Sequence, residues 1–200
     1  TLKVAWVHGE NSMLQSTWCL NGHNSLFNFK SMSKAVLGDP SRTVWTSIQS
    51  ETSDFLPPIT FIATDGVVSD SGTTTVGGNH GTNGGDGLLT ATMTEFSIFK
   101  DGHLLIGDFI GYADSIQTKH TNLIYAGNTV NEQRYCMQQD FHLNFTAGNI
   151  EVIAEETALH NIKIYRNGGT QLIGGPWKDS AHFYGGTQQG PLTGTSTTIM

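Results

Sequence analysis

The sequence predicts an all-β protein, an antiparallel β-sandwich of jelly-roll-like form with about ten strands and little helix. Short runs of alternating apolar and polar residues are separated by Gly, Asn, Asp and Pro, as in half-buried strands joined by turns. Only 14% of the residues are charged and 24 of the 200 are glycine, a composition that favours sheets and turns over exposed helices. Turn pairs such as Asn21-Gly22 and Asp101-Gly102 favour antiparallel hairpins.

The N-terminal part of the chain is predicted to contain strands and one short helix. The expected strands cover residues 2–7, 13–20, 26–29, 44–48 and 59–63. Residues Ser31–Leu37 are the best helical candidate, which ends before Gly38-Asp39-Pro40. Pro57 and Pro58 require an extended backbone ahead of the strand over residues 59–63.

The C-terminal part is predicted to be entirely β. A hairpin around Lys100-Asp101-Gly102 joins strands over residues 88–99 and 103–110. Further strands are expected within residues 112–125, 131–145, 150–158 and 161–165. Residues 1–190 are therefore expected to form one domain, followed by a Gly/Thr-rich tail over residues 191–200.

The alternation within residues 131–145 assigns a core face and a polar face to one strand. The predicted core face carries Tyr135, Met137, Gln139, Phe141, Leu143 and Phe145. The opposite face carries Cys136 and a polar row formed by Arg134, Gln138, Asp140, His142 and Asn144. These side chains donate or accept hydrogen bonds in fixed planar geometry, which suits sugar hydroxyls and carboxylates. The polar row is therefore a candidate ligand surface, and an ordinary solvated sheet face is the alternative.

The stretch Val76–Gly87 is a second candidate site, because half of its residues are glycine although strands are predicted on both sides. Glycine is favoured where φ is positive or where a ligand approaches the backbone. Asn79 is a candidate ligand-binding residue, and His80 is a candidate catalytic residue because histidine exchanges protons near neutral pH. The alternative is a surface loop in which Asn and Gly supply only turn geometry.

Composition and spacing exclude several classes of function. The net charge of −7 with only 10 Lys+Arg argues against a nucleic-acid partner. No apolar run is long enough to span a membrane, so no membrane partner is expected. No metal-ligand spacing, nucleophile elbow or phosphate-binding loop occurs, so no cofactor or metal is expected. Cys19 and Cys136 either form one disulfide or remain buried thiols.

Three stretches carry a resemblance to known proteins: Asp54-Phe-Leu-Pro-Pro, Gly77-Gly-Asn-His-Gly and Phe183-Tyr-Gly-Gly-Thr-Gln. In general style the chain resembles bacterial and phage proteins that bind or cut polysaccharide, including β-sandwich polysaccharide lyases and phage depolymerase or tail-fibre domains. The resemblance implies a secreted or virion-associated protein whose partner is a polysaccharide.

The favoured function is β-elimination at a uronic acid, which requires neutralisation of a carboxylate and removal of a C5 proton. Arg134, with Asn79 or Gln138, would neutralise the carboxylate, and His80 or His142 would take the proton. Tyr184 would protonate the leaving oxygen, although a buried tyrosine with a satisfied hydroxyl is the commoner outcome.

Two alternatives remain open at this point. The first is a non-catalytic carbohydrate-binding or phage receptor-binding module that forms a homo-oligomer. Its Asn and Gln side chains would form hydrogen bonds with sugar hydroxyls. The second is a glycoside hydrolase with two carboxylates drawn from Asp86, Glu95, Asp108 and Asp140, which the sequence does not pair.

Overall fold

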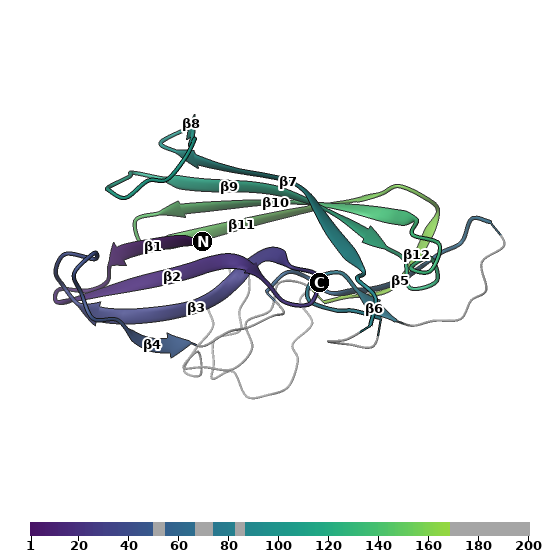
Figure 1. Cartoon of the computed structure of the whole chain (residues 1–200), viewed down its shortest axis with the longest axis horizontal. Helices are drawn as coiled ribbons and strands as arrows, with labels where there is room; N and C mark the ends of the chain where they lie inside the picture. Colours follow the sequence, from purple (N-terminus) through teal and green to yellow (C-terminus); the bar gives the residue numbers. More distant parts are fainter. Residues whose placement is uncertain (50–54, 67–73, 83–86, 169–200) are drawn as a thin grey trace, which may run out of the picture.

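The computed structural model describes residues 1–49, 55–66, 74–82 and 87–168. Within these ranges the chain is all-β: twelve strands form three antiparallel sheets, and no helix is present (Figure 1). None of the described residues belongs to a helix of the length and apolar character that crossing a membrane requires. The predicted tail over residues 191–200 lies outside the described residues.

Two larger sheets contain most of the strands. The four-stranded sheet has the order β1-β2-β3-β4 and consists of Leu2–Val7, Ser12–Asn21, Leu26–Val36 and Thr46–Gln49. The five-stranded sheet has the order β11-β10-β9-β7-β8 and consists of Asn149–Ala158, Tyr135–Thr146, Ile116–Tyr125, Ala91–Lys100 and His103–Leu104. A small sheet, β12-β5-β6, consists of Ile162–Asn167, Ile59–Ala63 and Thr75–Val76.

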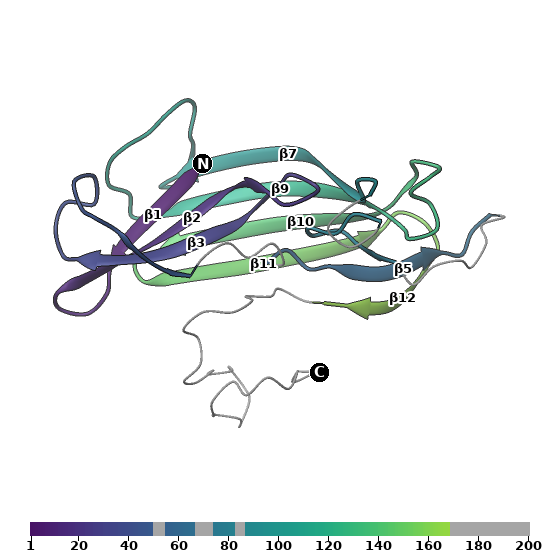
Figure 2. The same cartoon turned by 60° about the horizontal axis from the view of Figure 1, so that its bottom comes forward.

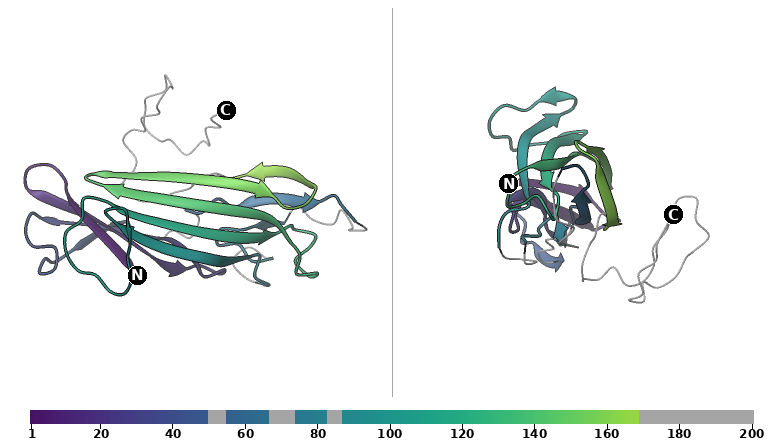
Figure 3. Two further views of the ribbon diagram at one scale, coloured as in Figure 1. Left: turned by 90° about the horizontal axis from the view of Figure 1, so that it is seen from above. Right: turned by 90° about the vertical axis from the view of Figure 1, so that its right-hand side faces the viewer.

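The two larger sheets form separate layers (Figures 2 and 3). An aromatic core joins them. Trp18 of β2 is fully buried, and its ring centroid lies 5.4 Å from that of Phe145 on β10. The Trp18 centroid also lies 5.3 Å from the ring centroid of Phe29 on β3 and 4.9 Å from that of Phe55, which precedes β5. Edge-to-face packing of this kind adds to the free energy of burying large rings. The predicted fold class, an antiparallel β-sandwich, is confirmed.

The alternation predicted for β10 is also confirmed. Residues Met137, Gln139, Phe141, Leu143 and Phe145 are buried, whereas Gln138, Asp140, His142 and Asn144 are only half-buried. Two residues depart from the pattern next to a register irregularity between Tyr135 and Met137: Cys136 is buried, and Tyr135, expected on the core face, is only half-buried. Cys136 and Cys19 are both free thiols, so the disulfide alternative does not hold.

Two predicted elements are wrong. Ser31–Leu37 is not a helix, because this stretch pairs with β2 on one side and β4 on the other as part of β3. Sheet hydrogen bonds on both sides outweigh a weak local helix preference. The strand expected over residues 103–110 is limited to His103–Leu104, and the chain then forms a loop. The carboxylate of Asp101 accepts the N–H groups of Asp114 and Ser115, at 2.8 and 3.0 Å, and so closes that loop.

His120 of β9 is a buried titratable group within the core. Its ring stacks on Phe141 with 5.2 Å between centroids and lies 5.6 Å from Phe27. Neither ring nitrogen has a hydrogen-bond partner among the described residues. Burial, reinforced by the nearby His142 and opposed by Asp140, lowers the pKa of His120 from 6.5 to about 4. His120 is therefore neutral in the folded protein at neutral pH.

The free energy of unfolding is expected to fall as the pH is lowered from about 6.5 to about 4, by about 3 kcal/mol from His120 alone. In this range the unfolded chain binds a proton at His120 that the folded chain, with its lowered pKa, does not bind. The measurement is urea unfolding of the wild type and His120→Phe across this range, with the exposed His8→Phe as control. The His120 variant should lose this part of the pH dependence and the His8 variant should retain it; equal slopes in all three proteins would contradict the prediction.

Candidate functional site

The outer face of the five-stranded sheet carries a polar hollow of about 270 Å³. Its lining residues are Glu95, Ser97, Lys119, His120, Thr121, Asp140 and His142. The strand register produces this grouping, because Thr121 of β9 is opposite both Glu95 of β7 and Asp140 of β10. In the next row Lys119 is opposite both Ser97 and His142. Since the alternate residues of β9 and β10 are buried, these two rows project away from the core.

A hydrogen-bond network holds the Asp140 carboxylate in place. Gln138 Nε2 donates to Asp140 Oδ2 at 2.7 Å, and Thr121 Oγ1 donates to Asp140 Oδ1 at 2.5 Å. Lys119 Nζ lies 5.3 Å from the centroid of the Phe99 ring. The hollow therefore presents two carboxylates, one ammonium group and the imidazole of His142 on a fixed scaffold, whereas the ring of His120, which also borders the hollow, packs on Phe141 in the core. Such an arrangement can bind hydroxyl groups through donors and acceptors, and it places a cation beside a proton acceptor.

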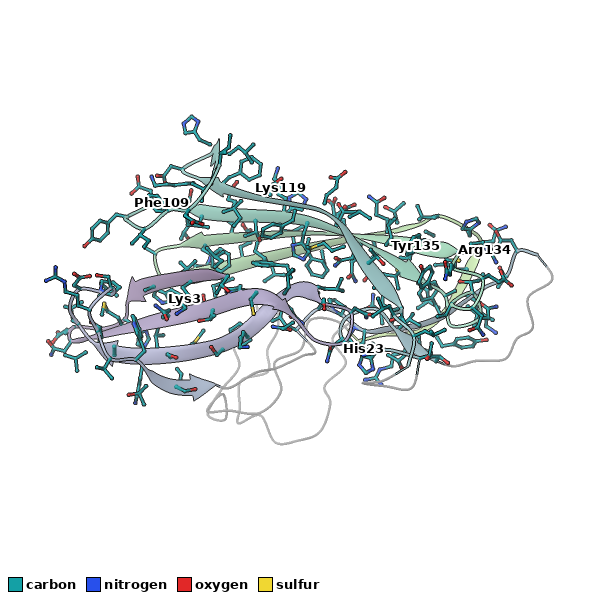
Figure 4. All side chains as sticks on the ribbon, viewed as in Figure 1. Lys3, His23, Phe109, Lys119, Arg134 and Tyr135 are labelled. Atoms are coloured by element: carbon teal, nitrogen blue, oxygen red, sulfur yellow. The ribbon has the colours of Figure 1, made fainter. Side chains whose placement is uncertain are left out.

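Arg134, the first member of the predicted polar row, belongs to a different cluster. Its Nη1 lies 2.8 Å from Asp65 Oδ1, and its Nε lies 3.7 Å from Glu132 Oε2. His160 Nδ1 lies 2.9 Å from the other Asp65 oxygen, Oδ2. The Arg134 hydrogen bond, and to a smaller extent His160, lower the pKa of Asp65. Figure 4 shows Arg134 at the end of the sandwich, far along the sheet from Lys119.

Backbone contacts between separate loops build this charged cluster. Asn128, in the β9–β10 connection, exchanges two hydrogen bonds with the backbone of Ala63, at 2.9 and 3.0 Å. The N–H of Thr64 donates to the carbonyl of Asn161 at 2.8 Å, which brings the β11–β12 turn to the end of β5. Asp65, Arg134 and His160 therefore meet because these loops meet, and the cluster holds the loops together.

The glycine-rich stretch packs against the turn between β2 and β3. Asn24 Nδ2 donates to the carbonyls of Gly78 and His80, at 3.0 and 3.1 Å, and Asn24 Oδ1 accepts the N–H of Thr90 at 2.9 Å. The Asn79 side chain accepts the backbone N–H of His23. Asn79 therefore anchors the turn, and the carbonyl of His80 is used in the same network.

Close approach explains two of the glycines at this contact. A Cβ at Gly78 would lie 2.7 Å from the carbonyl oxygen of Leu56, and φ at Gly78 is +51°. At Gly22, where φ is +77°, a Cβ would overlap the Asn79 side chain. Both positions require glycine because φ is positive and because a Cβ would meet the Leu56 backbone at Gly78 and the Asn79 side chain at Gly22. At Gly78, turn geometry and packing, the alternative interpretation of the Val76–Gly87 stretch, account for the glycine.

The structure brings together only part of the predicted site. Asp140 and His142 line the hollow, and Gln138 and Asn144 lie beside them on the same face of β10. Arg134 belongs to the Asp65 cluster, and Asn79 and His80 belong to the loop beside the β2–β3 turn. Tyr184 and Asp86 lie outside the described residues.

Sequence reasoning missed Ser97, Lys119 and Thr121, and it named Glu95 only as one of several carboxylates. The sequence feature that could have found these residues is the alternation of apolar and polar residues on β7 and β9, which separates outward from inward side chains. It does not reveal which strands are neighbours. Among the residues that the structure describes, no group of three or more His, Cys, Asp or Glu side chains is arranged to hold a metal ion.

Comparison with family models, with curated protein sequences and with solved structures found no match. The fold and the hollow therefore define the protein only as an antiparallel β-sandwich with a polar site on the outer face of its larger sheet.

Gly78→Ala is expected to lower the free energy of unfolding by about 3 kcal/mol, since it adds an atomic overlap to an unfavourable φ. The matched control is Gly102→Ala, where φ is +81° but a Cβ meets nothing within 4 Å. That variant should cost about 1 kcal/mol. Chemical denaturation measures both, and equal losses would show that the Leu56 contact does not require glycine.

Proposed function

We propose that the protein binds a polysaccharide chain on the outer face of its five-stranded sheet, as a carbohydrate-binding β-sandwich. The observation that carries this proposal is the hollow in which Glu95, Lys119, Asp140 and His142 converge from three neighbouring strands. Polar side chains converging on a concave surface are typical of ligand sites.

The chemistry of this face suits a hydroxyl-rich ligand. Amide, hydroxyl and carboxylate groups offer both donors and acceptors, and the Asp140 network fixes their directions before a ligand arrives. The face continues along β10 from Gln138 to Asn144, about 20 Å at about 3.3 Å per residue, which is long enough for a short oligosaccharide. The open, solvent-facing position of the hollow favours binding over chemistry that must exclude water.

Binding is tested on a glycan array and then by calorimetry with the glycans that bind. Lys119→Ala and Asp140→Asn are each expected to weaken binding about tenfold or more, because each removes a charged hydrogen-bonding group. Lys30→Ala and Glu10→Gln, at exposed positions on other strands and turns, are the matched controls and should bind as the wild type does. Absence of binding to every glycan, or equal loss in the controls, would refute the proposal.

Eliminative cleavage of a uronic-acid polysaccharide is the second candidate function. It is favoured by one observation: Lys119 and His142 are opposite each other in the β9–β10 register and line the same hollow. Lys119 would neutralise the uronate carboxylate, and His142 would accept the C5 proton. The C4–O glycosidic bond would break as the C4–C5 double bond forms, and the leaving oxygen would take a proton from solvent water in the open hollow. Arg134 is less suited to this task because Asp65 and Glu132 already compensate its charge.

Incubation with acidic polysaccharides distinguishes the two candidates. Elimination creates a carbon–carbon double bond, so ultraviolet absorbance should rise together with reducing ends and should be lost in His142→Gln. Reducing ends without absorbance would indicate hydrolysis, for which Glu95 and Asp140 are the carboxylates on either side of Thr121. If neither absorbance nor reducing ends increase while glycan binding is retained, both catalytic candidates are refuted and the binding module remains.

A further inference from the structure

The loop between β8 and β9 displays large apolar side chains to solvent. Ile106, Ile110 and Tyr112 are 87%, 93% and 90% exposed, and Leu104 before them is 56% exposed. Isolated apolar residues on a surface need no explanation, but several on one short loop indicate a contact surface.

Specific contacts order this loop. Asp101 closes its base through the N–H groups of Asp114 and Ser115. Lys100 Nζ lies 5.2 Å from the ring centroid of Phe109, a cation–π contact that ties the loop to the end of β7. Phe109 is 40% exposed, whereas Ile106, Ile110 and Tyr112 are almost fully exposed on this ordered scaffold. The loop therefore pays little additional conformational entropy when a partner covers it.

A second apolar surface lies at the same end of the molecule, on the other sheet (Figure 1). Val36 ends β3 and is 77% exposed, and Val44, just before β4, is 88% exposed. Lys34 pairs with Thr46 in the antiparallel β3–β4 register. Val36 and Val44 each lie two residues beyond this pair, so they are neighbours at the end of the two strands. The Leu37 side chain, 46% exposed, adjoins them.

The two surfaces have complementary charges. The β8–β9 loop carries the exposed carboxylates of Asp108 and Asp114 beside its apolar side chains. The β3–β4 surface carries two exposed cations, Lys34 and Arg42, and one exposed carboxylate, Asp39, which leaves one positive charge in excess. Arg42 lies 3.6 Å from Asp39, and Lys34 is the cation left in excess. Apolar groups edged by opposite charges can pack without leaving a buried charge unpaired.

From this complementarity we infer that the protein pairs with a second copy of itself: the β8–β9 loop of each copy packs on the β3–β4 surface of the other. Reciprocal use of two different patches closes a two-fold dimer. A stable interface buries roughly 800 Å² per partner, and reciprocal use of both patches brings more surface into contact than either patch alone. A lipid surface fits less well, because Asp108 lies between Ile106 and Ile110 and burying its carboxylate in hydrocarbon is costly.

Sedimentation velocity of the full chain over about a 100-fold concentration range tests the pairing. The wild type should be a dimer, and Ile106→Asn/Ile110→Asn and Val44→Asn should each raise the dissociation constant about 100-fold or more. Leu20→Asn is the matched control, since Leu20 is 57% exposed on β2 and lies outside both patches. It should dimerise as the wild type does. Circular dichroism and melting curves establish that each variant is folded.

Exchanging charged residues between the two surfaces tests the pairing directly. Asp108→Lys and Lys34→Asp should each weaken the dimer about tenfold, and the two substitutions in one chain should restore it. A monomeric wild type, an unchanged dimer in the Val44 or loop variant, or the absence of rescue would overturn the inference. Co-sedimentation of the wild type with phosphatidylcholine vesicles that is lost in the loop variant would overturn it in favour of a lipid surface.

Discussion

The antiparallel pairing of β9 with β10 is the constraint on which both the core and the hollow depend. From Ile116 to Ile124 on β9, opposite Phe145 to Met137 on β10, each residue has a defined partner across the pair. Since successive side chains alternate between faces, this register places His120 against Phe141 inside the sandwich. The same register places Thr121 beside Asp140 and Lys119 beside His142 outside it. A slip of one residue would exchange the two sets, so the aromatic core also fixes the hollow.

The ends of the sandwich are organised by polar contacts rather than by apolar packing. At one end, Asn24 and Asn79 connect the glycine-rich stretch to the β2–β3 turn, and the Asp65–Arg134–His160 cluster connects three further loops. Side-chain amides satisfy backbone groups that no sheet can pair, and the charge pairs join the side chains of neighbouring loops. Several residues that look functional in the sequence therefore have structural roles.

The two proposed surfaces occupy different parts of the molecule. The hollow lies on the outer face of the five-stranded sheet, whereas the apolar patches lie on loops at one end. The loops proposed for pairing contain none of the residues that line the hollow. A dimer would then present two glycan-binding faces, and simultaneous binding of one long polysaccharide by both would raise the apparent affinity without any new contact.

The sequence by itself determined the fold class, the positions of most strands and the two faces of β10, because period-two alternation and turn residues are local properties. It did not determine that Ser31–Leu37 is a strand, since that depends on β2 and β4 as neighbours. Nor did it determine that Glu95 and Lys119 join Asp140 and His142, or that Arg134 joins Asp65 instead. Only the tertiary structure decided these groupings, because strand order and loop docking arise from contacts between residues far apart in the chain.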